Sequence, residues 1–267
     1  MLPFVFKDGQ IQKLLSFELT VEAVDGSKWN FFAGNSVSVK SVIKVDTKRP
    51  EVNIIGSSYK IMKGGVATVI FKAQDEAMKS LYVETNFGKK FYPTPFYKEG
   101  YYITLVAWPT NIESFSASVV ALDRAGNLTK AHIPYFLQDK KYKTSTIALD
   151  DRFLDGKIAD LIAEMAPERS SLTKLEKFKY VNEDMRKGNE ANILKVTSNV
   201  PTELISGFYL KPFYPLRNGK VVASFGDHRF YEYDKQPTSE SYHLGLDLAS
   251  NAQAAMQTSN DGVVVFA

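Results

Sequence analysis

The stretch SASVVALDRAGN, residues 116–127, alternates between two sets of residues and ends with Ala121-Leu122-Asp123 and Gly126-Asn127. Such alternation is typical of a half-buried β-strand, and Asp and Gly-Asn are residues that form turns. The stretch LTVEAVDGSKWNFFAGN, residues 19–35, repeats this pattern with Ala23-Val24-Asp25 and Gly34-Asn35. The same strand and turn are therefore predicted twice, near the end of a repeated β-module.

The second copy is complete. After Thr47 to Pro50 come the strand-like segments EVNII, GVATVIFKAQD, SLYVETNF, YYITLVAW and SASVVALD, separated by turn residues such as Gly64-Gly65 and Pro109. This spacing predicts a β-sandwich over residues 46–138, with a tight turn at 123–127. Strand alternation predicts these inward-facing residues: Val69, Phe71, Tyr82, Leu105, Val119 and Ala121.

The stretch VDTKRPEVNII resembles the start of bacterial immunoglobulin-like envelope modules, so we assign residues 46–142 to an immunoglobulin-like β-sandwich. Residues 1–45 contain only the back half of such a module. We expect them to form strands that lack their partner sheet, because half a sandwich leaves a face and an edge bare. This pattern predicts that the chain is truncated at its N-terminus.

Residues 143–200 are predicted to form a helical connector. Phe153, Ile158, Leu161, Ile162 and Met165 recur at helical spacing, and Pro167 should end that helix. Ser170-Ser171 are expected to cap a second helix that runs to about residue 187. The connector is expected to pack on its neighbours rather than to bind a cofactor.

From Pro201 the sequence again indicates strands, in GFYLKPFYPL, in KVVASFGDHRFYEYD and, after the predicted turn Asn260-Asp261-Gly262, in DGVVVFA. Residues 201–267 are therefore predicted to be the incomplete start of an antiparallel β-sheet domain. The predicted fold class is mainly β: sandwich modules, a helical connector and the beginning of this sheet.

Composition narrows the classes of function. The chain has no cysteine, which excludes disulfides, cysteine nucleophiles and thiolate zinc sites. The net charge of +3 comes from interspersed charges without a basic stripe, so no nucleic acid is expected as a partner. No apolar run is long enough for a transmembrane segment. MLPFVFKDGQ is too short for a signal peptide, so the protein is cytosolic or its true start lies upstream of Met1, and the repeat favours the second.

The stretch SYHLGLDLAS, residues 241–250, contains a candidate metal site. On a strand, His243 and Asp247 point one way and the leucines between and beyond them point into a core. Four strand steps span about 13 Å, so the two side chains could share an ion only if the chain bends at Gly245. The alternative is an exposed histidine and aspartate on the wet face of a strand.

The wider context resembles the LytM/lysostaphin-like zinc metallopeptidases. Phe225-Gly226, Arg229, the motif from His243 to Ala249, and Gly262-Val263-Val264 occur in the order of that family, within about residues 208–267. The resemblance implies that His243 and Asp247 are two of three protein ligands of Zn²⁺, which polarises the scissile carbonyl. It implies a peptidase that cuts peptide cross-links of peptidoglycan in the bacterial envelope, periplasmic or secreted, with envelope proteins as further partners.

The family completes its site with a downstream His-x-His motif that supplies the third ligand and a catalytic histidine, which we expect beyond Ala267. The chain as given should then be inactive alone. Arg229 is expected to position a loop or stabilise the fold, His228 to be exposed or to lie behind the ligands, and His132 to be structural. Two other hypotheses stay open: a non-catalytic envelope protein that binds peptidoglycan or activates another hydrolase, and an adhesion protein built on the β-modules. A His-x-His motif past codon 267 would favour the enzyme.

Overall fold

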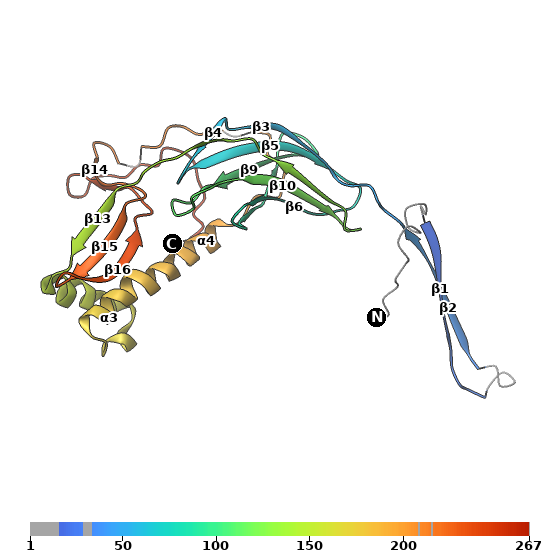
Figure 1. Cartoon of the computed structure of the whole chain (residues 1–267), viewed down its shortest axis with the longest axis horizontal. Coiled ribbons are helices and arrows are strands. Elements are labelled where there is room, and N and C mark those ends of the chain that lie inside the picture. Colours follow the sequence, from blue (N-terminus) through green and yellow to red (C-terminus); the bar gives the residue numbers. More distant parts are fainter. Residues whose placement is uncertain (1–15, 29–33, 208, 215, 267) are drawn as a thin grey trace.

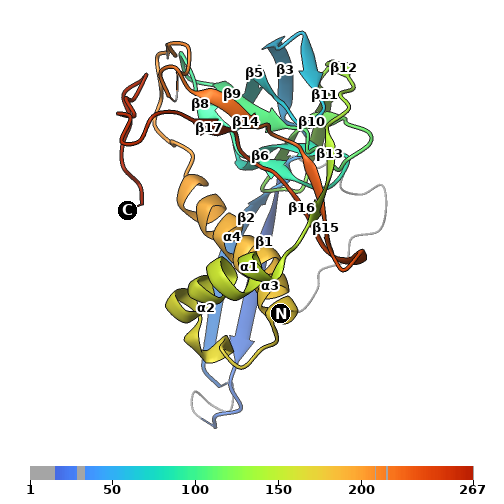
Figure 2. The same cartoon turned by 90° about the vertical axis from the view of Figure 1, so that its left-hand side faces the viewer.

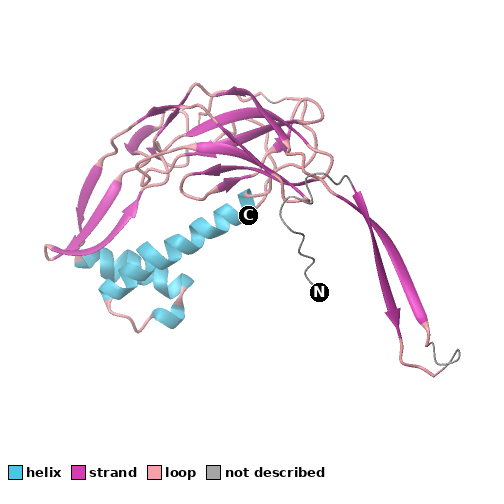
Figure 3. Ribbon diagram, turned by 45° about the vertical axis from the view of Figure 1, so that its right-hand side comes forward, coloured by secondary structure: helices cyan, strands magenta, loops and turns pink. Residues whose placement is uncertain are grey.

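The structure is a computed structural model that describes residues 16–28, 34–207, 209–214 and 216–266. It is mainly β, and its parts follow one another along an arch (Figure 1). A two-stranded hairpin extends from one end, a β-sandwich occupies the middle, and helices lie beneath strands β15 and β16 at the other end (Figure 3).

The sandwich contains two four-stranded sheets, in the orders β11-β10-β6-β7 and β3-β5-β9-β8. All neighbouring strands within these two sheets are antiparallel. A short parallel pair, β4 with β12, lies beside them. The strands are β3 (Glu51–Ser57), β4 (Lys60–Met62), β5 (Val66–Gln74), β6 (Met78–Thr85), β7 (Lys90–Phe91), β8 (Thr94–Pro95), β9 (Tyr101–Ala107), β10 (Ala117–Asp123), β11 (Leu128–His132) and β12 (Phe136–Gln138).

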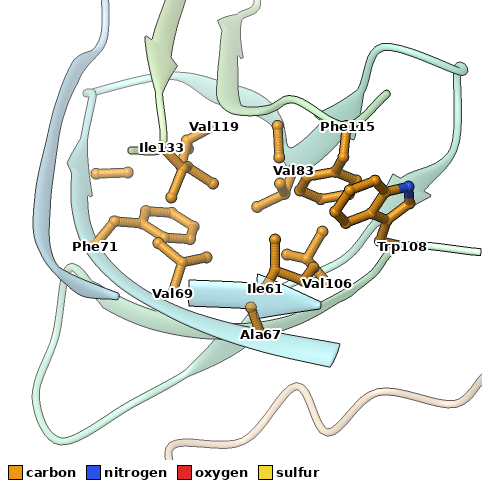
Figure 4. Packing of buried hydrophobic residues seen from close by; sticks show 12 residues of the cluster. Ile61, Ala67, Val69, Phe71, Val83, Val106, Trp108, Phe115, Val119 and Ile133 are labelled. Carbon is orange, nitrogen blue, oxygen red and sulfur yellow. The ribbon is translucent and has the colours of Figure 1, made fainter. Parts of the chain in front are cut away.

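The core of the sandwich fills the space between the two sheets (Figure 4). Val69 and Phe71 from one sheet and Val119 from the other are completely buried, and Trp108 stacks on Phe115 with ring centroids 5.7 Å apart. The inward positions predicted for Val69, Phe71, Val119 and Ala121 are confirmed. Burial of this apolar surface is the main force that holds the two sheets together.

Two of the predicted core positions are wrong. Leu105 is 61% exposed while the adjacent Val106 is fully buried, because Val106 pairs with the buried Ala67 and paired residues share a face. Tyr82 is only half-buried, because Val83 and not Tyr82 is the partner of Val119. Lys90 Nζ lies 4.3 Å from the centre of the Tyr82 ring.

The repeated turn is present in both copies. Asp123 N donates to Asn127 O over 3.2 Å, and Asn127 donates two bonds to the Asp123 carboxylate over 2.7 and 2.8 Å. Asp25 and Asn35 form the same three bonds over 3.0, 2.8 and 2.9 Å. The predicted tight turn after β10 is therefore confirmed, and the first copy closes its longer loop with the same chemistry.

The first copy is the hairpin of β1 (Ser16–Val24) and β2 (Ser36–Lys44), a two-stranded sheet. Its register also repeats, since Val21 pairs with Val39 as Val119 pairs with Ala131. Val21 is 57% exposed although the equivalent Val119 is fully buried. The described part of residues 1–45 thus forms strands without a partner sheet, as predicted, whereas 1–15 and 29–33 lie outside the described residues.

Residues 150–187 are mainly helical and are interrupted at Pro167, as predicted. The segments are α1 (Asp151–Phe153), η2 (Leu154–Ile158), α2 (Ala159–Met165), η3 (Pro167–Arg169), α3 (Lys174–Lys179), η4 (Tyr180–Met185) and α4 (Arg186–Thr197). The predicted cap at Ser170-Ser171 is wrong: Thr173 and Glu176 form a capping box. Within the described residues, no helix is long and apolar enough to cross a bilayer.

Two small sheets complete the fold. One has the order β13-β15-β16, formed by β13 (Thr144–Ala148), β15 (His228–Tyr233) and β16 (Gln236–Tyr242). The other pairs β14 (Lys220–Ala223) with β17 (Asp247–Ala249). Strand β13 comes from the predicted connector and runs parallel to β15, whereas β15 and β16 are antiparallel. Helices pack on one face of the larger sheet through Phe178 and Tyr231, 5.1 Å apart at their ring centroids (Figure 2).

Two further strand predictions are wrong. Residues 209–214 and 261–266 have no strand structure. A strand needs a hydrogen-bonded neighbour, and none of the described strands pairs with either segment. Instead, the Asn260 side chain accepts a bond from Lys211 N and donates one to Lys211 O, over 2.8 and 3.2 Å.

The repeated turn gives a matched pair of substitutions. Asn127 also donates to Asp46 O over 2.9 Å, so Asn127→Ala removes bonds that close the turn and hold the start of the sandwich. We expect it to lower the free energy of unfolding of the sandwich by about 1–3 kcal/mol in urea denaturation. Asn35→Ala removes the equivalent side-chain bond to Asp25 from the exposed hairpin and should leave this transition unchanged. Equal effects of the two substitutions would contradict this expectation.

Candidate functional site

His243 and Asp247 converge across a bend. Strand β16 ends at Tyr242 and β17 begins at Asp247, and the chain between them bends at Gly245. His243 Nε2 lies 3.1 Å from Asp247 Oδ1. The predicted convergence is therefore present, while the role of the two residues as metal ligands stays a prediction.

The second ring nitrogen of His243 is held by the backbone. Nδ1 lies 2.9 Å from the carbonyl oxygen of Ser224, which can only accept, so Nδ1 carries the hydrogen. In the neutral ring, Nε2 is then an acceptor that faces the Asp247 carboxylate, which is also an acceptor. The arrangement therefore requires a cation between or on these groups, either a proton or a metal ion.

The leucines of this stretch do not enter a core, contrary to the prediction. Leu244 and Leu246 are 53% and 50% exposed, and Leu248 is half-buried. Side chains alternate between two faces only in a strand, and residues 243–246 are not in a strand, so the alternation does not apply to them.

A turn at Gly226 and Asp227 fixes the backbone of His243. Gly226 N donates to His243 O over 2.7 Å, and His243 N donates to Asp227 O over 2.9 Å. Gly226 has a φ of +86°, which favours glycine. The Phe-Gly pair upstream of the histidine therefore has a structural role, because its turn places the histidine backbone.

Asp227 and Arg229 extend this support to Asp247. The Asp227 side chain is 7% exposed and accepts from Ser145 Oγ over 2.7 Å and from Arg229 Nε over 3.3 Å. Arg229 Nη2 lies 3.9 Å from Asp247 Oδ2, on the carboxylate oxygen that does not face His243. Arg229 thus links the buried carboxylate to the candidate ligand, which agrees with the positioning role expected for it.

The electrostatics of Asp227 favour its charged form. Burial raises the pKa of this carboxyl, but hydrogen bonds from Ser145 and Arg229 and the charges of Lys143 and Arg229 outweigh burial and hold the pKa below its ordinary value. An ionised Asp227 keeps Arg229 in place at neutral pH.

The other two histidines are engaged elsewhere. The His228 ring contacts the rings of Phe230 and Tyr242, each with its centroid 4.2 Å away, and its Nε2 is 3.0 Å from Glu240 Oε2. His132 is an exposed residue of β11, paired with Ser118. Among the described residues, neither histidine has a side-chain hydrogen bond or ion pair to His243 or Asp247.

One cluster was not predicted from the sequence. Carboxylate oxygens of Asp46, Asp75 and Asp123 lie within 4.8 Å of one another at the end of the sandwich near the hairpin. Asp123 is fully buried and receives the bonds of the repeated turn, which outweigh its burial and lower its pKa. The three residues are far apart in sequence, so no local motif marks the cluster.

No family model and no curated protein matches the chain. Among solved structures, a crystal structure of the titin domains Z1Z2 in complex with telethonin matches with 12% sequence identity and a TM-score of 0.26. The match spans 39% of this chain and 58% of the titin chain, and at this TM-score it carries no argument about fold or function.

Asp227 predicts a defined acid sensitivity. Because its pKa is lower in the folded protein, its contribution to stability is present above the unfolded pKa near 3.8 and is lost as the pH falls through the folded value. We expect Asp227→Asn to lower the free energy of unfolding at pH 7. The difference in this free energy between wild type and variant should become smaller below about pH 4. Ser145→Ala should shift the acid limb to higher pH. Parallel curves for wild type and Asp227→Asn in urea unfolding across acid and neutral pH would contradict this.

Proposed function

We propose that His243 and Asp247 supply two protein ligands to Zn²⁺ in a metallopeptidase that cleaves peptide cross-links of bacterial peptidoglycan. One observation carries the proposal. His243 Nδ1 donates to Ser224 O, and this leaves Nε2, an acceptor, 3.1 Å from Asp247 Oδ1. Two acceptors at this separation call for a proton or a metal ion between them.

The donor set fits zinc. An imidazole nitrogen and a carboxylate oxygen are both common zinc ligands, at about 2.0–2.2 Å from the ion, and two such ligands of a tetrahedral ion lie about 3.3 Å apart. The backbone carbonyl on the other ring nitrogen is the kind of partner that orients ligating histidines. Zinc would supply Lewis acidity toward a peptide carbonyl.

The chain's own residues prepare this site. The Gly226 turn fixes the backbone of His243, and Ser224 fixes the rotation of its ring. Arg229 lies against the far oxygen of Asp247, so the near oxygen stays directed at His243. The resemblance to the LytM/lysostaphin-like family, carried by these same residues, names the substrate class.

We further propose that the sandwich is an immunoglobulin-like module of an envelope protein. Its sheet β3-β5-β9-β8 has the order expected for strands A, B, E and D, and β7-β6-β10-β11 that expected for C′, C, F and G. The repeat of the β10–β11 turn in β1–β2 supports a series of such modules.

The alternative is a non-catalytic envelope protein that uses the same scaffold to bind peptidoglycan peptides or activate another hydrolase. It would use the same His243 and Asp247 without the downstream histidines, since His228 is engaged by Phe230, Tyr242 and Glu240.

Metal analysis after equilibrium dialysis tests the site. We expect the chain to bind Zn²⁺ weakly, His243→Ala to abolish this binding, and His228→Ala to leave it unchanged. Arg229→Gln should weaken it by about 10- to 100-fold, the usual effect of removing a residue that supports a ligand. Stoichiometric zinc that survives His243→Ala would show that the stretch is only an exposed bend.

The reaction is tested with purified peptidoglycan and the gene product that includes the expected downstream His-x-His motif. We expect this protein to release soluble wall peptides and the His243→Ala variant to release none. Binding of peptidoglycan without release, or a gene lacking the motif, would favour the non-catalytic alternative.

A further inference from the structure

Tyr142 lies in contact with two glycines from different parts of the fold. Gly64 follows β4 in the sandwich, and Gly226 precedes β15 at the candidate site. A Cβ atom on Gly64 would lie 2.1 Å from Tyr142 Oη, and a Cβ atom on Gly226 would lie 2.0 Å from Cδ1 of the same ring. Both glycines have positive φ, +78° and +86°, so each turn needs glycine for its backbone and for the space that the tyrosine occupies.

The tyrosine is bound on both sides. Its hydroxyl donates to Lys63 O over 2.7 Å, and the adjacent Gly64 N donates to Trp108 O over 2.7 Å. On the other side, the Tyr142 ring meets Phe225 edge-on with centroids 6.0 Å apart. Burial raises the pKa of Tyr142, which keeps the hydroxyl protonated as a donor.

The glycine next to this ring is bonded to the backbone of His243. Gly226 N donates to His243 O, and the next residue, Asp227, accepts from His243 N. Tyr142 therefore connects Lys63 and Trp108 of the sandwich to the turn that holds the candidate ligand.

A groove of about 1120 Å³ lies beside this joint. It is lined by Trp108 and Pro109 of the sandwich, by Arg186 and Glu190 of α4, and by Phe225 and Leu244. Leu244 follows His243 directly in the chain, and Phe225 precedes Gly226, so the groove borders the segments that carry the site.

We propose that Tyr142 is a positioning residue that locks the sandwich against the turn holding His243, so that the sandwich forms a fixed wall of the groove beside this turn. The lock itself depends only on these contacts. The use of the groove by a bound peptide rests on the proposed function.

The lock predicts one relative position of the sandwich and the β13-β15-β16 sheet. The chain has no cysteine, so spin labels can be attached at Asn53→Cys in the sandwich and Gln236→Cys in the sheet, both exposed. Double electron–electron resonance should give a single narrow distance distribution. Gly226→Ala and Tyr142→Ala should each broaden or shift it, while Tyr142→Phe, which keeps the ring but loses the bond to Lys63 O, should have a smaller effect.

Gly88→Ala is the matched control for backbone strain. Gly88 has a φ of +79°, but no heavy atom lies within 4 Å of the Cβ position. It should leave the distance distribution unchanged, even if it destabilises its turn. The double variant Gly226→Ala/Tyr142→Ala should be no broader than Tyr142→Ala alone, because the three nearest contacts of the added methyl group are all Tyr142 atoms.

Circular dichroism identifies any variant that does not fold. If Gly226→Ala does not fold, the distance distributions of Tyr142→Phe and Tyr142→Ala are compared instead. A narrow distribution in folded Tyr142→Ala, or equal effects of Gly226→Ala and Gly88→Ala, would overturn the proposal. The distances are measured without added metal, so a failure of zinc binding would leave the proposed lock intact.

Discussion

The candidate site depends on the two backbone hydrogen bonds between His243 and the turn at Gly226 and Asp227. They hold the chain where β16 ends, and the bend at Gly245 then returns Asp247 to the imidazole. Without a fixed starting point, a bend between His243 and Asp247 would leave their side chains free to separate. A pair of main-chain bonds is well suited to this role, because it defines the direction of the chain as well as its position.

The turn has a cost and a benefit. Its glycine must adopt positive φ, and its aspartate is a buried carboxylate that needs partners. Ser145 and Arg229 provide these partners, and Arg229 also reaches Asp247. A buried charge and a candidate ligand therefore share one guanidinium, which ties the stability of the turn to the geometry of the site.

Local patterns predicted the fold where a few neighbouring residues decide the structure. The Asp–Asn turn was predictable twice, because its bonds join residues of one recurring sequence pattern, and the helices were predictable from Pro167 and apolar periodicity. Which residues of β9 face the core was not predictable, because Ile103 and Thr104 are both buried and the alternation fails there. The strand predicted at 261–266 is absent, because apolar residues alone do not make a strand, which also needs a hydrogen-bonded neighbour. At the site, the sequence indicated His243, Asp247 and the bend, but not Tyr142, whose glycine partners are distant in the chain.

The protonation of His243 tests the account most directly. Long-range ¹H–¹⁵N correlation spectra distinguish the two neutral ring forms, and His228 and His132 can be assigned by substitution. The account predicts hydrogen on Nδ1, with the Nε2 resonance shifting when Zn²⁺ is added and the Nδ1–H form retained. A His243 ring that carries its hydrogen on Nε2 and does not respond to zinc would contradict it.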